Sequence, residues 1–200
     1  MMNQLRKYRS VLIFSLLYVI GFSAYYIAIK DFEFLWYVFV LVALFALILS
    51  TLHRSQFPPY IVWGLSLWGL LHMAGGGVVV GGKVLYAHIL IPLFNGGGEL
   101  VLLKYDQVVH AFGFGVATLV VYHLIRPYLN EKVNWKVLYP IIIVAGMGLG
   151  ALNEIIEFGA VLFFPETGVG GYMNTALDLV FNTLGACVAI IGVYIFGKKK

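Results

Sequence analysis

Six ionisable side chains lie in parts of this chain that are otherwise almost wholly apolar, and their types are those that carry out chemistry. They are His72, Asp106, His110, Glu154, Glu157 and Asp178. Asp106 and His110 are four residues apart, and Glu154 and Glu157 are three apart, so each pair shares one face of a helix. An ionisable group inside a membrane-spanning helix costs roughly 3 kcal/mol unless it pairs, lines a cavity or acts. The set therefore predicts a functional site.

The charges of this set predict what the site contains. Four carboxylates would lie together, and no Lys or Arg lies within the same helices to offset them. In a low dielectric, either protons are shared among the carboxylates or a bound cation supplies positive charge. Carboxylates mixed with imidazole suit zinc, manganese or iron. We expect Glu154 or Glu157 to act as general base on a metal-bound water. The predicted metal ligands are His72, Asp106, His110 and Asp178.

The elements that must position these residues are membrane helices. Hydrophobic residues make up 62% of the 200 residues and charged residues 11%, against about 25% charged in a soluble domain. Apolar runs of about 20 residues, enough to cross a bilayer, recur along the chain. We expect one integral membrane domain over 1–200, of all-α class, a polytopic bundle of about six helices. The first run is expected to be retained, since it is longer than a signal peptide. The predicted helices cover 10–30, 33–52, 58–74, 106–126, 137–163 and 172–196.

The basic residues predict the orientation of this bundle. With both termini in the cytoplasm, ten of the thirteen Lys and Arg residues lie inside, and only Lys30, Lys83 and Lys104 lie outside. The net charge of +4 is thus explained by topology and predicts no nucleic-acid partner. In this orientation the polar groups lie at similar depth in the outer leaflet of the cytoplasmic (inner) membrane.

Other residues predict how the helices pack. Gly146 with Gly150, and Gly185 with Ala189, have the small-xxx-small spacing that allows helices to approach closely. Three asparagines are expected to be interhelical hydrogen-bond partners rather than ligands. They are Asn153, Asn174 and Asn182. The segment 75–104 has an apolar middle at 84–94 that is too short to span, which predicts an interfacial or re-entrant piece.

Four motifs in a fixed order carry a family resemblance over about residues 60–190. They are Leu71-His72-Met73-Ala74-Gly75-Gly76, Tyr105-Asp106 through His110, Asn153-Glu154 through Glu157, and Asn174, Asp178, Asn182 and Gly185. This order resembles the YjdF-like family of prokaryotic inner-membrane proteins. It is more distantly similar to the VanZ-like proteins, which share Asp-x-x-x-His followed by Asp-x-x-x-Asn-x-x-Gly. The YjdF-like pattern tends to have Asp at the position of Asn174, so one possible acidic ligand is absent here. The resemblance supports the grouping of these residues and implies no reaction. VanZ-like proteins are associated with glycopeptide-antibiotic tolerance, so the distant similarity to them implies a role at the cell envelope.

Three functions remain open from the sequence. The leading hypothesis is a metal-dependent hydrolase or transferase that acts on a lipid or lipid-linked envelope substrate, with membrane lipids as partners. The second is a proton- or cation-coupled transporter whose carboxylates bind the coupling ion. The third is a structural protein whose polar cluster only locks the helices together. Bound metal favours the first hypothesis, and substrate flux favours the second.

Overall fold

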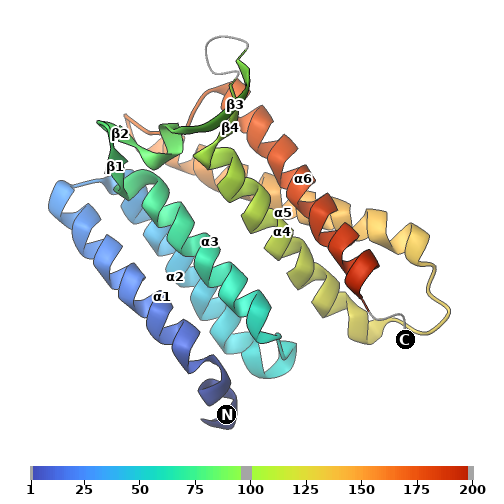
Figure 1. Cartoon of the computed structure of the whole chain (residues 1–200). Helices are drawn as coiled ribbons and strands as arrows, with labels where there is room; N and C mark the ends of the chain where they lie inside the picture. Colours follow the sequence, from blue (N-terminus) through green and yellow to red (C-terminus); the bar gives the residue numbers. More distant parts are fainter. Residues whose placement is uncertain (1, 96–100, 198–200) are drawn as a thin grey trace. The chain divides into compact units, whose positions relative to one another are not determined.

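Six α-helices dominate the computed structural model, which describes residues 2–95 and 101–197 (Figure 1). They are α1 (Met2–Ile29), α2 (Phe32–Ser55), α3 (Pro59–Gly77), α4 (Tyr105–Ile125), α5 (Trp135–Phe163) and α6 (Tyr172–Phe196). Each matches a helix predicted from the sequence, and the all-α polytopic class is confirmed. The boundaries agree within a few residues, except that α1 begins earlier, at Met2. The predicted cytoplasmic lysines at 198–200 lie outside the described residues.

Five of these helices are long and apolar enough to cross a membrane by length and composition. The candidate spans are Arg6–Ile29, Phe32–Ser55, Tyr105–Tyr128, Trp135–Phe163 and Tyr172–Phe196. Helix α3 has 19 residues, and its glycines, tryptophans and His72 lower its hydropathy. A sixth crossing by α3, and the cytoplasmic location of both termini, stay predictions.

The segment between α3 and α4 forms two small antiparallel hairpins that the sequence analysis did not anticipate. Strands β1 (Val79–Val80) and β2 (Lys83–Val84) pair with Val79 opposite Val84. Their two-residue turn, Gly81-Gly82, has φ of +56° and +79°, which glycine adopts without strain. A short 3₁₀ helix, η1 (Leu85–Ala87), leads to β3 (Ile89–Asn95) and β4 (Val101–Lys104). The interfacial location of 84–94 stays a prediction, and 96–100, in the same loop, lie outside the described residues.

The chain divides into two compact units. The N-terminal unit comprises Met1–His88 and Phe158–Val169, and the C-terminal unit comprises Ile89–Glu157 and Gly170–Lys200. Helix α5 contributes to both units. The single membrane domain over residues 1–200 stays a prediction.

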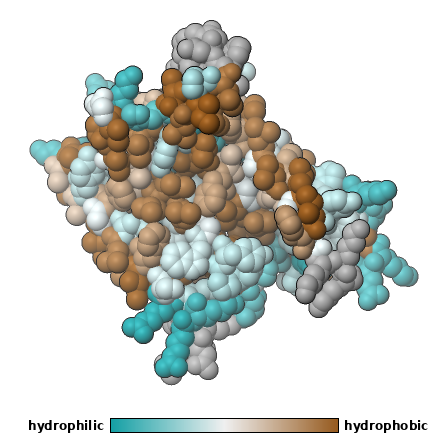
Figure 2. All heavy atoms as spheres, viewed as in Figure 1, coloured by the Kyte–Doolittle hydropathy of each residue, from teal (hydrophilic) through white to brown (hydrophobic). Residues whose placement is uncertain are grey.

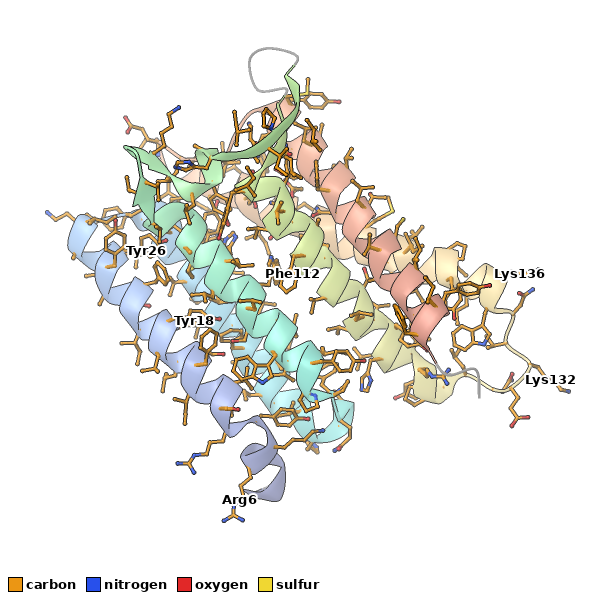
Figure 3. The ribbon with its side chains drawn as sticks, in the orientation of Figure 1. Arg6, Tyr18, Tyr26, Phe112, Lys132 and Lys136 are labelled. Carbon is orange, nitrogen blue, oxygen red and sulfur yellow. The ribbon has the colours of Figure 1, made fainter. Side chains whose placement is uncertain are left out.

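Helices α1, α2 and α3 lie side by side in the N-terminal unit (Figure 1). Tyr18 and Tyr26 project from α1 (Figure 3) and donate hydrogen bonds to α3 backbone carbonyls. Tyr18 Oη lies 3.0 Å from the Ser66 oxygen, and Tyr26 Oη lies 2.5 Å from the Met73 oxygen. Buried aromatic rings thereby join the helices without leaving a hydroxyl unpaired.

Helices α4 and α6 lie side by side in the C-terminal unit (Figure 1) and make its tightest contact. A Cβ added at Gly185 would collide with the backbone carbonyl oxygen of Ala111. A Cβ at Gly150 of α5 would lie 2.7 Å from Nδ2 of Asn182. The predicted close approach is therefore confirmed at both glycines, and it brings three helices near Asn182.

The outward helix surfaces are apolar, as lipid-facing surfaces must be. Figure 2 shows hydrophobic residues over much of the visible face. Leu17 of α1 is 67% exposed and Val188 of α6 is 69% exposed. Such exposure of large aliphatic side chains along whole helices fits a bilayer as solvent.

Candidate metal site in the C-terminal unit

The first turn of α4 is fixed by a polar cap. The side-chain oxygen of Gln107 accepts hydrogen bonds from the backbone N–H groups of Leu103, at 2.7 Å, and Lys104, at 3.1 Å. Leu103 has a φ of +67°, a left-handed conformation that is costly for a leucine. This turn sets the direction in which α4 begins, and it holds Asp106 and His110 on one helix face.

His110 lies at the centre of the site, with its side chain only 6% exposed. Four carboxylates surround it, one on its own helix α4, two on α5 and one on α6. Its Nε2 lies 3.6 Å from Asp106 Oδ1, 3.9 Å from Glu157 Oε1 and 4.0 Å from Asp178 Oδ1. Its Nδ1 lies 3.7 Å from Glu154 Oε1. We call these five residues the acidic–histidine cluster.

Asn182 determines which ring nitrogen of His110 is available. The Asn182 Oδ1 lies 3.0 Å from His110 Nδ1, and a carbonyl oxygen can only accept. In the neutral tautomer that fits this contact, Nδ1 carries the proton and donates a hydrogen bond to Asn182 Oδ1. Nε2 then keeps its lone pair, on the side where three carboxylate oxygens lie. A histidine that donates one N–H to a neighbour and presents its other nitrogen is the usual arrangement of a metal ligand.

Asn174 orients two of the carboxylates. Its Nδ2 donates to Asp178 Oδ2 at 2.6 Å and to Asp106 Oδ2 at 3.3 Å. Because one oxygen of each carboxylate is engaged by the same amide, the other oxygen of each lies toward His110 Nε2. Asn153 acts similarly on α5, where its Nδ2 donates to Glu157 Oε1 at 2.7 Å.

Several polar atoms of the cluster are buried without a hydrogen-bond partner among the described residues. They are both carboxylate oxygens of Glu154, Oδ1 of Asp178 and Nδ2 of Asn182. The side chains of Glu154 and Asp178 are 9% and 1% exposed. Buried polar groups are nearly always paired, and a bound ion or water would satisfy these carboxylate oxygens.

The charges around the cluster also favour a cation. The five residues bring four carboxylates to one imidazole. Lys104, directly before α4, lies close enough to Asp178 to act on it electrostatically. One ammonium group cannot offset four negative charges in a low dielectric. A divalent ion would offset two of them.

The positions of the ligand atoms fit a metal ion. Two groups of side chains place their ligand atoms within 4.8 Å of one another: Asp106, His110 and Asp178 in one, and His110, Glu154 and Glu157 in the other. At a metal–ligand distance of about 2.1 Å, tetrahedral ligand atoms lie about 3.4 Å apart. The Nε2–oxygen distances of 3.6–4.0 Å exceed this by only a few tenths of an ångström. This buried cluster could therefore hold a metal ion.

The structure brings five of the six predicted site residues together within the C-terminal unit, and the sixth belongs to the other unit. His72 belongs to the N-terminal unit, where its Nδ1 lies 2.5 Å from the Tyr86 hydroxyl. Neither candidate ligand group includes it. Its assignment as a metal ligand, like the catalytic roles of Glu154 and Glu157, stays a prediction.

The prediction that three asparagines bond between helices is confirmed for two of them. Asn174 and Asn182 bond across helices, to residues of α4, as expected. Asn153 was expected to do the same, but it bonds to Glu157 one turn along its own helix. The cap by Gln107 was missed, although a Gln three residues after a helix start is a recognisable capping signal.

Comparison with known proteins gives a family and no function. No curated protein and no solved structure matches the chain. A family model described as "Predicted membrane protein (DUF2238)" matches residues 9–199. The YjdF-like resemblance is consistent with this match, which does not extend to the VanZ-like proteins. The chain belongs to the DUF2238 family of multi-pass membrane proteins, whose function is unknown.

Proposed function

We propose that the acidic–histidine cluster binds one divalent metal ion and that the protein is a metal-dependent hydrolase or transferase of the cytoplasmic membrane. One observation carries the proposal: Asn174 and Asn182 orient Asp106, Asp178 and His110 so that two carboxylate oxygens lie beside the unprotonated Nε2. Ligands held in place by a second layer of hydrogen bonds are typical of metal sites.

The donor atoms favour some metals over others. One imidazole nitrogen with two or three carboxylate oxygens suits zinc, manganese or iron. Calcium prefers six to eight oxygen ligands, and magnesium keeps several waters. We therefore expect zinc, manganese or iron rather than calcium or magnesium.

Glu154 is the better candidate for the general base. Glu157 is already engaged by Asn153, and its Oε1 lies on the Nε2 side of the imidazole. A Glu154 oxygen lies within 4.8 Å of the ligand atoms of His110 and Glu157, near enough to reach a water on the ion, and both Glu154 oxygens lack a hydrogen-bond partner among the described residues. A divalent ion held by the cluster would supply an acidified water, and Glu154 would be the carboxylate that accepts its proton during hydrolysis or transfer on a lipid or lipid-linked substrate.

A purely structural cluster is less consistent with these contacts. Polar residues that only join helices are expected to satisfy one another, because an unpaired buried group costs about 1–3 kcal/mol. The unpaired atoms of Glu154 and Asp178 do not fit that role. They fit a site that is completed by a bound ion.

Metal content of the purified protein tests the proposal directly. The full chain in detergent is exposed in turn to zinc, manganese and iron(II), desalted, and analysed for metal per protein. We expect one equivalent in the wild type and a loss of at least tenfold in affinity for Asp178→Asn, which keeps the shape of the side chain. Glu166→Gln is the matched control, since Glu166 is exposed in the N-terminal unit. Absence of bound metal, or equal loss in the control, would refute the metal site.

Activity separates the enzyme from the transporter. The metal-loaded protein is incubated with a bacterial polar lipid extract, and the products are followed by mass spectrometry. Glu154→Gln should retain metal and lose product formation. Metal-driven or proton-driven flux in liposomes, without any lipid product, would instead establish the transporter hypothesis.

A further inference from the structure

The N-terminal unit contains an apolar groove that the proposed metal site does not use. It has a volume of about 400 Å³ and is lined by residues of α1, α2 and α3. Its walls include Leu12 and Leu16 of α1, and Phe45 and Leu49 of α2. Leu16 is 59% exposed and Leu49 is 44% exposed, so the groove opens toward the surroundings of the helices.

The length of the groove matches one leaflet of a bilayer. On α1 its lining runs from Tyr8 to Val19, which is about 16 Å at 1.5 Å per residue. On α2 it runs from Val42 to Leu52, about 15 Å. Half of a hydrocarbon core of about 30 Å is about 15 Å. One acyl chain of a phospholipid fits this length.

One end of the groove is strongly basic. Tyr8 and Leu52 form this end; Arg9 follows Tyr8 in α1, and Arg54 stands two residues after Leu52, in the last turn of α2, from where its long side chain can reach the end of the groove. Both arginines are exposed, and neither forms an ion pair with a described carboxylate. Helix α1 contains no acidic residue, and the only acidic residue of α2, Glu33, lies in its first turn, at the opposite end from Arg54.

The neighbouring polar groups at this end are already engaged. Tyr8 donates to the backbone carbonyl of Phe57 at 2.5 Å, and Lys7 donates to the same oxygen at 3.4 Å. These bonds fix the end of the groove, and Arg9 and Arg54 are the arginines nearest in sequence to its lining residues. Guanidinium groups bind phosphate in bidentate geometry.

We infer that the N-terminal unit binds an anionic phospholipid, with one acyl chain in the groove between α1, α2 and α3 and the phosphate at Arg9 and Arg54. Basic pockets beside transmembrane helices on the cytoplasmic side are established sites for anionic headgroups. A zwitterionic lipid has the same acyl chains without net negative charge, so the arginines should discriminate against it. This inference is independent of the proposed metal chemistry.

Native mass spectrometry of the full chain in detergent tests the inference with phosphatidylglycerol and phosphatidylcholine of identical acyl chains. Each basic residue near an anionic headgroup contributes about fivefold in affinity. Arg9→Gln with Arg54→Gln should thus weaken phosphatidylglycerol binding about 25-fold and leave phosphatidylcholine binding unchanged. Lys132→Gln with Lys136→Gln is the charge-matched control in the C-terminal unit (Figure 3) and should change neither.

A second pair of variants tests the groove itself. Ala46 lines the groove and is exposed, so Ala46→Trp should fill it without opening a cavity and should displace both lipids. Ala43→Trp, on the same helix but outside the groove lining, is the control for added bulk. Equal affinity for the two lipids, equal loss in the lysine control, or unaltered binding in Ala46→Trp would overturn the inference.

Discussion

Replacement of Asn174 by leucine tests whether the cluster is a preorganised metal site, because it removes no ligand. The side chain keeps its approximate size but loses the amide that donates to Asp106 and Asp178. Both carboxylates are then free to rotate, and their other oxygens no longer lie beside His110 Nε2. Loss of such a second-layer partner costs about 10–100-fold in metal affinity. This corresponds to about 1.4–2.7 kcal/mol.

The affinity is measured by competition with a chromophoric chelator, on the purified protein in detergent. Thr183→Val is the control, because Thr183 lies on the same helix, is half-buried and bonds only to the Leu179 carbonyl among the described residues. Thermal unfolding of both variants without metal checks that they remain folded. An affinity for Asn174→Leu within twofold of the wild type would refute preorganisation by this amide. Equal weakening in Thr183→Val would show that any change in α6 has the same effect.

Three further outcomes are expected. Gly185→Ala should lower the free energy of unfolding by about 1–3 kcal/mol, because the added Cβ meets a backbone carbonyl oxygen of α4. Gly192→Ala is the control and should leave the free energy of unfolding unchanged, because the space around Gly192 is open. Thermal unfolding measures both variants. Tyr26→Phe should cost about 1 kcal/mol through the lost bond to α3, and an unaltered melting temperature would contradict this. A reporter fused at the C-terminus should report the cytoplasm, and one inserted in the β1–β2 turn should report the outside; the reverse pattern would show that the orientation is wrong.

The helices were predictable because each apolar run is as long as a bilayer crossing and ends at a recognisable residue. Pro58 and Pro59 begin α3, and Pro165 follows α5. The hairpins between α3 and α4 were not predictable by the same reasoning. Strands of two residues have no period that a pattern can reveal, and only the Gly81-Gly82 turn marks them.

The grouping of five of the six candidate residues was predictable, and the hydrogen bonds that order them were not. Asp106 and His110 share a helix face by spacing alone, and burial cost singles out Glu154 and Asp178. The hydrogen bond from His110 to Asn182, by contrast, joins residues 72 positions apart. It depends on the rotation of α6 against α4, which is set by side-chain packing rather than by local sequence. His72 was grouped with the others on depth along its helix, which does not fix where it points.

The buried carboxylates also constrain how the chain is synthesised. Glu154 and Glu157 emerge from the ribosome and enter the membrane before the segment that carries Asn174, Asp178 and Asn182 exists. Each ionised carboxylate costs roughly 3 kcal/mol at the centre of an isolated helix on insertion scales. During that interval α5 has neither Asn182 beside it nor a complete set of ligands. Binding of the proposed ion through the Asp106, His110 and Asp178 group would therefore follow insertion of the last helix, which would make it a late step in biogenesis.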